Sequence, residues 1–283
     1  MILVTGATGN VGSAVLAQLV EEGHEVRALV RDPAKLGEIA GKVEVVKGDL
    51  SKPETLDPAF AGADKVFLLC NAGGAMAEVV GNAVDAAKRG GVKHIVMLSS
   101  ASVAGGHGTL IGTWHRDAEA IIKASGIAWT MVQPGAFATN TLRWAGSIKA
   151  QAAVFQPTGD GATAPIDPRD IAEVAVKALT TPGHEGKSYV LTGPEALTAA
   201  EQVAKISGAI GKPLRFVDVP EDAAREGMVK AGLPEVFIRA MLEAFAMMKA
   251  GHGKEISPTV EQLLGRKART YEEWLRSNVK AFQ

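Results

Sequence analysis

The sequence predicts an α/β protein with a doubly wound parallel sheet, followed by a smaller, helix-rich C-terminal domain. Its first apolar run, at residues 2–4, leads through a glycine-rich turn into an amphipathic helix, and further short apolar runs alternate with helical patterns as far as Pro134. Short apolar strands separated by helices are typical of parallel sheets buried on both faces. Beyond Pro134 the alternation gives way to irregular stretches and helices. We therefore expect the sheet domain over 1–134, with later segments able to return to it, and a mainly substrate-binding domain over 135–283.

The turn after the first strand has the glycine spacing GxxGxxG, at Gly6, Gly9 and Gly12. The first glycine lets the chain turn out of the strand, the second lets the backbone approach a pyrophosphate, and the third lets the helix pack closely on the sheet. The helix N-terminus behind them has unpaired N–H groups, which favour a negative ligand. A tight turn without a ligand explains one glycine but not three in this register, so the sequence predicts a dinucleotide site. The residues expected to contact the dinucleotide here are Gly6, Thr8, Gly9, Asn10, Val11 and Gly12.

The end of the second strand indicates which dinucleotide is bound, because an acidic residue there hydrogen-bonds the ribose 2′-hydroxyl of NAD. This chain has Arg31 at that point, and a guanidinium suits the geometry of a 2′-phosphate. We expect Lys35 to be a second cation, whereas Asp32 favours NAD(H) unless it faces the helix that begins near Pro33. A solvated surface arginine is the alternative interpretation of Arg31. The sequence therefore predicts NADP(H) in preference to NAD(H).

Composition is that of an ordinary water-soluble enzyme. The 283 residues include 30 Lys and Arg against 31 Asp and Glu, without the basic excess expected of a nucleic-acid-binding domain. The single cysteine excludes an internal disulfide and fits a reducing compartment. Met1 runs directly into the first strand with no leader or long apolar segment. We therefore expect a cytoplasmic protein with no nucleic-acid or membrane partner.

Four further apolar runs predict strands whose carboxyl ends form the ligand edge of the sheet. The runs are Val43–Asp49, Lys65–Cys70, His94–Ser100 and Trp129–Pro134. Asp49 and Leu50 are expected near the adenine, although a turn cap explains Asp49 equally well. Cys70 and Asn71 are expected near the nicotinamide half, where the cysteine is more often a small apolar filler than a nucleophile.

The C-terminal part has helix signals and an aromatic stretch. Thr198 and Thr270 are each followed three residues later by Glu, which predicts capping boxes. In the segment 221–251, four apolar side chains recur at helical spacing, and core packing is favoured over a pocket wall for most of them. They are Phe237, Met241, Phe245 and Met248. The residues expected to contact a substrate are Phe137, Trp144 and Phe155.

Segments spread along nearly the whole chain resemble a known family. They are TGATGNVG, VRDP, KGDL, LSS, the HxxxE of His115 and Glu119 with SGIAWTMVQPGAF after it, IDPRDIAEVA and RTYEEWL. Together they resemble the NmrA-like group of atypical short-chain dehydrogenases/reductases, in the branch that includes NAD(P)H:quinone oxidoreductase type 2 and triphenylmethane reductase. The resemblance implies a Rossmann fold. One departure is Gln133, where related sequences usually have arginine before Pro-Gly.

The resemblance implies hydride transfer from NADPH to a quinone or a similar electron-poor acceptor. Classical short-chain reductases place a tyrosine and a lysine four residues apart, so that the tyrosine can protonate a carbonyl oxygen. Counted back from Glu119, those positions hold Ile111 and His115, and the two tyrosines, Tyr189 and Tyr271, lie elsewhere. Hydride transfer to a quinone gives a phenolate-like anion of modest basicity, which water or a histidine can protonate. The missing pair therefore argues against ordinary ketone reduction and sugar epimerisation.

His115 is the candidate proton donor, because an ordinary histidine pKa is about 6.5. Glu119 lies one helical turn away on the same face and would favour the imidazolium. The alternative is that His115 only hydrogen-bonds the nicotinamide ribose or packs beside Trp114. A metal site on the pair lacks a third ligand, so no metal is predicted. Ser99 and Ser100 are candidates to hydrogen-bond a substrate oxygen or, equally, to satisfy backbone groups at a strand end.

Two functions from different classes are consistent with the sequence. The first is an NADPH-dependent reductase of quinones or related acceptors. The second is a regulator of the NmrA type, which binds the dinucleotide without turnover and acts through a protein partner. The aromatic stretch favours the enzyme, because a sensor needs no second pocket. A homodimer is compatible with either.

Overall fold

A computed structural model describes the whole chain, Met1–Gln283, as two compact units. The first unit contains Met1–Pro134 and Pro168–Val190, and the second contains Gly135–Asp167 and Leu191–Gln283. The chain thus leaves the first unit after the sixth strand and returns to it for one helix and most of one strand. None of its helices combines the length and the apolar character needed to cross a bilayer.

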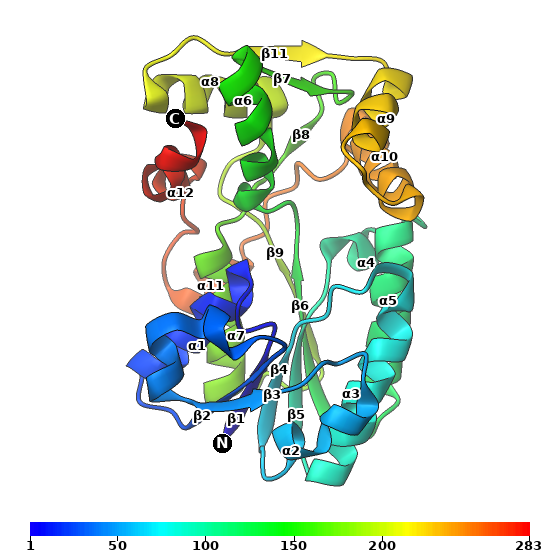
Figure 1. Ribbon diagram of the computed structural model, residues 1–283, viewed down its shortest axis with the longest axis vertical. Helices are drawn as coiled ribbons and strands as arrows, with labels where there is room; N and C mark the ends of the chain where they lie inside the picture. The colour runs from blue at the N-terminus through cyan, green and yellow to red at the C-terminus, as the bar shows by residue number, and fades with distance from the viewer. The chain divides into compact units, whose positions relative to one another are not determined.

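The first unit is built on a seven-stranded sheet with the order β3-β2-β1-β4-β5-β6-β9 (Figure 1). The strands are β1 Ile2–Thr5, β2 Val26–Val30, β3 Glu44–Lys47, β4 Lys65–Leu68, β5 His94–Leu98, β6 Ala128–Pro134 and β9 Lys187–Leu191. Strands β1 to β6 pair in parallel. The order reverses between β1 and β4, which is the switch point where ligands of such sheets bind. The predicted doubly wound parallel sheet is confirmed.

Helices cover both faces of this sheet. Helices α1 (Asn10–Glu21) and α7 (Pro168–Thr180) pack together on one face, and α3 (Met76–Gly90) and α5 (Leu110–Lys123) on the other (Figure 1). The shorter elements are η1 Pro33–Lys42, η2 Pro53–Thr55, α2 Asp57–Phe60, η3 Gly73–Ala75 and α4 Ala101–Gly105. Each long helix turns an apolar stripe to the sheet, as the 3.6-residue period of its sequence requires.

The core of the first unit lies between the sheet and its helices. All four residues of β1 are buried, and Leu3 packs in one cluster with Val80 of α3 and Ile122 of α5. Strands covered on both faces need apolar side chains at successive positions, which explains the continuous apolar runs in the sequence.

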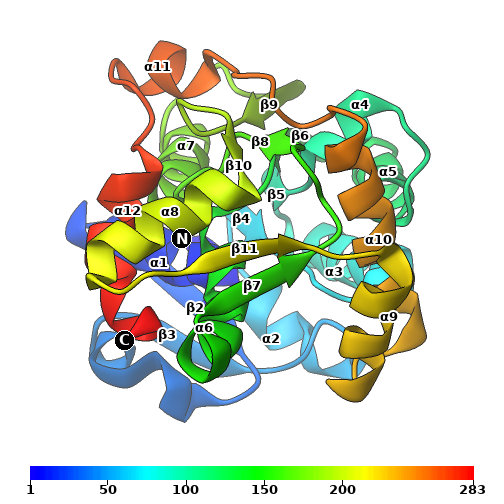
Figure 2. The ribbon, with the colours of Figure 1, turned by 90° about the horizontal axis from the view of Figure 1, so that it is seen from above.

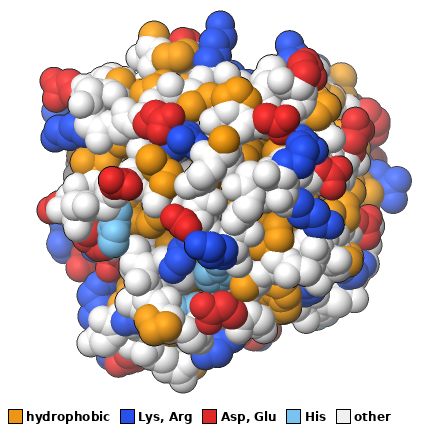
Figure 3. All heavy atoms as spheres, turned by 90° about the horizontal axis from the view of Figure 1, so that it is seen from below, with side chains coloured by type: hydrophobic (Ala, Val, Ile, Leu, Met, Phe, Trp, Pro, Cys, Tyr) orange, Lys and Arg blue, Asp and Glu red, His pale blue; other side chains and the backbone are white.

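On the face shown in Figure 3, Lys and Arg side chains are interspersed with Asp and Glu and form no large patch of one sign.

The second unit combines two small sheets with helices (Figure 2). Strand β7 (Ala153–Gln156) pairs in parallel with β11 (Arg215–Asp218), and β8 (Ala162–Thr163) pairs antiparallel with β10 (Leu197–Thr198). Its helical elements are η4 Ala138–Trp144, α6 Ala145–Gln151, α8 Ala199–Ile210, α9 Glu221–Lys230, α10 Glu235–Lys249, α11 Thr259–Leu264, α12 Tyr271–Asn278 and η5 Val279–Phe282. Its core cluster brings together α6, β7, α8 and α12.

Both predicted capping boxes are present in the second unit. The Thr198 and Thr270 hydroxyls accept the backbone N–H groups of Glu201 and Glu273, and each glutamate accepts the backbone N–H of its threonine. The α10 stripe agrees with the prediction of core packing for most of its residues, since Met241 and Met248 are half-buried. Phe245 is buried, but 38% of Phe237 is exposed. Helical spacing identifies a common face but does not show what covers each position on it.

Candidate functional site

The glycine turn has the geometry that its spacing predicts. Gly6 has φ of 61°, a left-handed conformation that suits glycine, and a Cβ there would lie 2.9 Å from Leu69 Cδ2. The backbone N–H of Gly9 donates to the Gly6 carbonyl at 2.9 Å. A Cβ at Gly12 would overlap that same carbonyl oxygen. Two of the three glycines are thus required by sterics, and the third closes the turn at the start of α1.

The N-terminus of α1 is available to an anion. Gly9 is the N-cap, no side chain caps the helix, and its first turn contains no acidic residue. Thr8, Gly9 and Asn10 are exposed, whereas Val11 and Gly12 are buried beneath them. Uncapped N–H groups at the positive end of a helix dipole fit a pyrophosphate. These residues therefore fit a dinucleotide.

Arg31 follows β2 directly and is exposed, as is Lys35. The competing carboxylate, Asp32, is the N-cap of η1 and accepts the backbone N–H of Ala34 at 3.2 Å. Asp32 therefore faces the helix. In this position its carboxylate does not oppose the binding of a phosphate beside Arg31. Arg31 also helps to lower the pKa of Asp49 at the neighbouring strand end.

Asp49 forms the turn cap that was its alternative interpretation. Its Oδ1 accepts the backbone N–H of Ser51 at 3.0 Å and the Ser51 hydroxyl at 2.9 Å. The backbone hydrogen bond is the main reason why the pKa of Asp49 is lowered. Leu50 is half-buried, and its carbonyl accepts the Asn82 amide at 3.2 Å. Contact of this pair with adenine stays a prediction.

Cys70 and Asn71 follow β4 at the same edge of the sheet. Asn71 is exposed and Cys70 is buried. Desolvation raises the pKa of the Cys70 thiol to about 11, so the residue is a neutral thiol at physiological pH. The interpretation as an apolar filler therefore fits better than a nucleophile.

His115 lies half-buried on α5, and its ring orientation is defined by one contact. Its Nδ1 lies 2.8 Å from the carbonyl oxygen of Ile111. Because a carbonyl only accepts, Nδ1 carries the proton, and in the neutral ring Nε2 is the nitrogen with a lone pair. Burial lowers the pKa of His115, and this effect exceeds the opposing charge of Glu119. Glu119 thus favours the imidazolium, as expected, but burial outweighs its charge.

The two serines after β5 have different partners. The buried Ser99 donates its hydroxyl to Glu119 Oε1 at 2.5 Å. Ser100 is the N-cap of α4, where its hydroxyl oxygen accepts the backbone N–H of Ser102 at 3.2 Å. Ser100 thus satisfies a backbone group, whereas Ser99 joins a side-chain network.

The residues of this site fall within a match to a known protein family. The model of the NAD(P)H-binding family matches residues 6–182, from the first glycine of the turn to the segment after α7. This chain belongs to the NAD(P)H-binding family. The match covers the glycine turn and the residues that follow β2, β3, β4 and β5.

Two curated relatives and one solved structure match the chain along its length. The NAD(P)H azoreductase of Xenophilus azovorans is 40% identical over 283 residues, covering 100% of this chain and 99% of the relative. The (4-alkanoyl-5-oxo-2,5-dihydrofuran-3-yl)methyl phosphate reductase of Streptomyces griseus is also 40% identical, with the same coverage. The NADPH-dependent quinone oxidoreductase of Escherichia coli, solved with NADPH, has a TM-score of 0.87 at 27% identity, over 98% of this chain and 99% of that one.

These matches confirm the family resemblance and the fold. They also support the enzyme class, because the two relatives that are 40% identical along the whole chain are named as reductases and the Escherichia coli structure is that of a quinone oxidoreductase. Of the two functions consistent with the sequence, the enzyme is therefore the one that they support.

One residue at the switch point was missed by sequence reasoning. The Thr5 hydroxyl lies 3.2 Å from the carbonyls of both Phe67 and Leu69, and its oxygen accepts the Leu69 N–H at 2.8 Å. Thr5 thereby ties the carboxyl ends of β1 and β4 together beside the glycine turn. A threonine at the end of an otherwise apolar strand is the signal that could have identified it.

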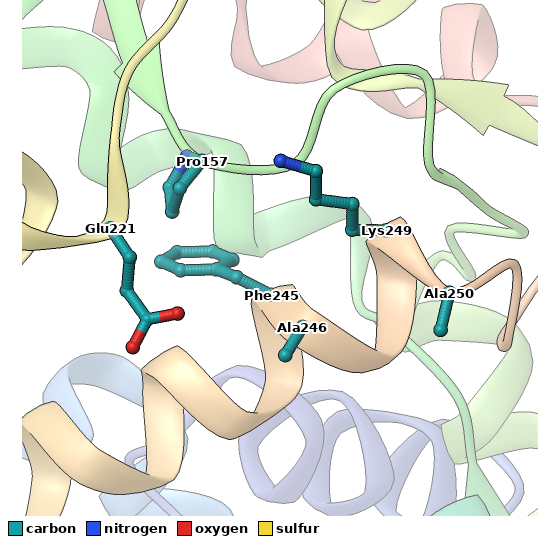
Figure 4. A pocket seen from close by; sticks show the side chains of 6 residues that line it. All are labelled: Pro157, Glu221, Phe245, Ala246, Lys249 and Ala250. Atoms are coloured by element: carbon teal, nitrogen blue, oxygen red, sulfur yellow. The ribbon is translucent and has the colours of Figure 1, made fainter.

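The predicted substrate residues lie in the second unit but do not share one environment. Trp144 packs against the core cluster, Phe137 is half-buried, and 42% of Phe155 is exposed. A cavity of about 320 Å³ lies elsewhere in this unit, with the Phe245 ring beside Pro157 (Figure 4). Its lining residues are Pro157, Glu221, Phe245, Ala246, Lys249 and Ala250. A substrate role for the three aromatics therefore stays a prediction.

Proposed function

We propose that this chain is an NADPH-dependent reductase that transfers hydride to a quinone or a similar electron-poor organic acceptor, with NADP(H) preferred over NAD(H). The observation that carries the proposal is the uncapped N-terminus of α1 beside an exposed Arg31, with Asp32 turned away onto η1. A pyrophosphate and a 2′-phosphate are the anions that suit these two features.

The class of hydride acceptor depends on whether the protein has a tyrosine that can protonate the reduced substrate. Tyr189 hydrogen-bonds His184 at 2.8 Å, and Tyr271 is buried with its hydroxyl donated to Thr141 at 2.9 Å. Burial raises the pKa of Tyr271 well above its ordinary value. Neither tyrosine lies on α5, so an acceptor whose reduced anion needs no strong acid suits this chain best. The names of the relatives specify azo, quinone and oxo-dihydrofuran compounds, in which conjugation stabilises the anion.

His115 is proposed to bind rather than to protonate. NADPH supplies the hydride when bound. The neutral ring with its proton on Nδ1 presents Nε2 as a hydrogen-bond acceptor, which suits a hydroxyl such as those of the nicotinamide ribose. Water is then the proton source for the reduced acceptor.

The test is the oxidation of NADPH and NADH with a panel of small quinones and an azo dye. In the wild type we expect turnover with clear NADPH preference. Arg31→Ala should lower kcat/KM for NADPH about 30-fold, the equivalent of one charge-assisted hydrogen bond, and leave NADH nearly unchanged. Arg89→Ala is the matched control, because Arg89 is an exposed arginine paired only with the exposed Asp57. No turnover with any acceptor, or equal use of both dinucleotides, would contradict the proposal.

A further inference from the structure

A buried carboxylate joins α5 to the ends of two strands. Glu119 is 1% exposed. Its Oε1 accepts the Ser99 hydroxyl at 2.5 Å and the Gln133 amide at 2.7 Å, and its Oε2 pairs with the Lys123 ammonium at 2.8 Å. Both carboxylate oxygens are therefore satisfied by three donors, as a buried charge requires.

These donors come from the carboxyl edge of the sheet and from the helix itself. Ser99 follows β5 and also bonds Val132 through the backbone at 2.7 Å, and Gln133 is near the end of β6. Sliding or rotating α5 would leave two buried donors without an acceptor, which is costly in a protein interior. Glu119 therefore defines the position of α5 relative to this edge.

His115 lies on α5 one turn before Glu119, so the same contacts define where its ring lies. Its Nδ1 is bonded to Ile111 and its Nε2 is the nitrogen that remains for a ligand. The position of Nε2 depends on the position of α5, and hence on the bonds that Glu119 accepts from Ser99 and Gln133.

We propose that Glu119 is a positioning residue of the reductase site: by anchoring α5 to Ser99 and Gln133, it sets the place at which His115 presents Nε2 to the bound dinucleotide. This inference rests on the proposed function. It also assigns the Ser99 hydroxyl proton to the anchor rather than to a substrate oxygen.

The informative variant is Glu119→Gln, which keeps the shape of the side chain but removes its charge. Its one oxygen can still accept from Ser99 and Gln133, but these bonds lose their charge assistance, and the new NH2 group faces the Lys123 ammonium, which is 40% exposed and also only donates. We expect Glu119→Gln to weaken NADPH binding, measured by calorimetry, and kcat/KM with a quinone each by about tenfold. In a His115→Ala background the same substitution should change both by less than about twofold, because residues that act together are not additive.

A second readout follows the His115 ring directly. Because the charge of Glu119 raises the pKa of His115 against the effect of burial, its removal should lower that pKa further, which NMR titration of the ring measures. A purely structural role for Glu119 would lower the melting temperature without the coupling to His115.

The matched control is Thr130→Val, which removes a buried hydroxyl on the same strand as Gln133 but at its other end. Thr130 bonds His94 and the His184 carbonyl. It should lower the melting temperature while leaving NADPH affinity and the His115 titration unchanged. The proposal is overturned if Glu119→Gln and His115→Ala are additive, if His115→Ala alone changes neither NADPH affinity nor kcat/KM, or if Thr130→Val reproduces the effects. If the wild type reduces no quinone, the proposed function fails, but NADPH affinity and the His115 titration still decide the role of Glu119.

Discussion

The two ends of the parallel sheet bury polar groups in opposite ways. At the carboxyl end, the charged Glu119 gathers donors from β5, β6 and α5. At the amino end, the buried groups form a chain in which the rings are neutral. The His94 ring lies 2.9 Å from the Thr130 hydroxyl, and that hydroxyl donates to the His184 carbonyl at 2.7 Å.

The ring protons at the amino end follow from these partners. Since Thr130 uses its proton on a carbonyl, His94 Nε2 must donate, and its Nδ1 is then a buried lone pair with no partner. The Thr181 hydroxyl likewise donates to the Lys177 carbonyl, so His184 donates to Thr181 through Nε2 and accepts from Tyr189 through Nδ1. Burial lowers the pKa of both histidines.

The same sheet thus has a buried charged group at its carboxyl end and buried neutral rings at its amino end. At the candidate site a carboxylate holds polar donors in place, and at the far end a proton added to His94 would have no acceptor. Function is expected to be sensitive to changes at the first end, and stability to changes at both.

The largest loss of stability is expected when a Cβ atom is added to a tightly packed glycine, and each end of the sheet has one such glycine. A Cβ at Gly12 would overlap the Gly6 carbonyl oxygen, and one at Gly90, at the end of α3 just before β5 begins, would overlap that of Phe60. Gly12→Ala and Gly90→Ala should each lower the free energy of unfolding by about 2–3 kcal/mol. Only Gly12→Ala should abolish NADPH binding, measured by calorimetry on protein shown to be folded. Loss of binding in Gly90→Ala would show that the two ends are not independent.

The next largest effect is acid destabilisation. A histidine whose folded pKa is lowered contributes stability that is complete above about pH 6.5 and is lost as the pH falls toward the folded pKa, because the unfolded chain takes up the proton first. Lys65 adds to the lowering of the His94 pKa, Lys187 adds to that of His184, and Glu185 opposes both. From pH 7.5 to 5.5 both histidines should therefore lower the free energy of unfolding measured in urea titrations.

His94→Gln tests this assignment, because glutamine retains an N–H donor for Thr130 but does not titrate. Its loss of stability between pH 7.5 and 5.5 should be smaller than that of the wild type. The exposed His24 provides the control His24→Gln. An unchanged pH dependence in His94→Gln would show that the buried ring is not the source.

The sequence predicted those parts of the site that depend on neighbouring residues. The positive φ of Gly6 and the overlap at Gly12 arise within one strand, turn and helix, so the glycine spacing reports them. Apolar runs reported the strands, because burial on both faces constrains every position. The capping boxes were predictable for the same reason, since donor and acceptor lie three residues apart.

Contacts between distant segments were not predictable. Ser99 and Gln133 meet Glu119 only because β5, β6 and α5 pack in one register, and no local pattern specifies that register. The proton balance of His115 was misjudged because spacing placed Glu119 nearby but could not show that burial outweighs its charge. The exposure of Phe237 was not predictable either, because amphipathicity does not show what covers each residue of a helix face.

The smallest effect on activity is expected at Cys70. This residue tests whether a thiolate contributes to the charge at the carboxyl end of the sheet. With its pKa raised to about 11, the thiol is ionised in about one molecule in a thousand at pH 8. Its alkylation, followed by intact mass, should therefore be slow and still accelerate above pH 9, whereas the urea-unfolded chain should level off near pH 9. Cys70→Ala should leave quinone reduction within about twofold of the wild type, because a small neutral filler is replaced by another. A plateau below pH 9 in the folded protein, or a large loss of activity in Cys70→Ala, would mean that a thiolate contributes at this end.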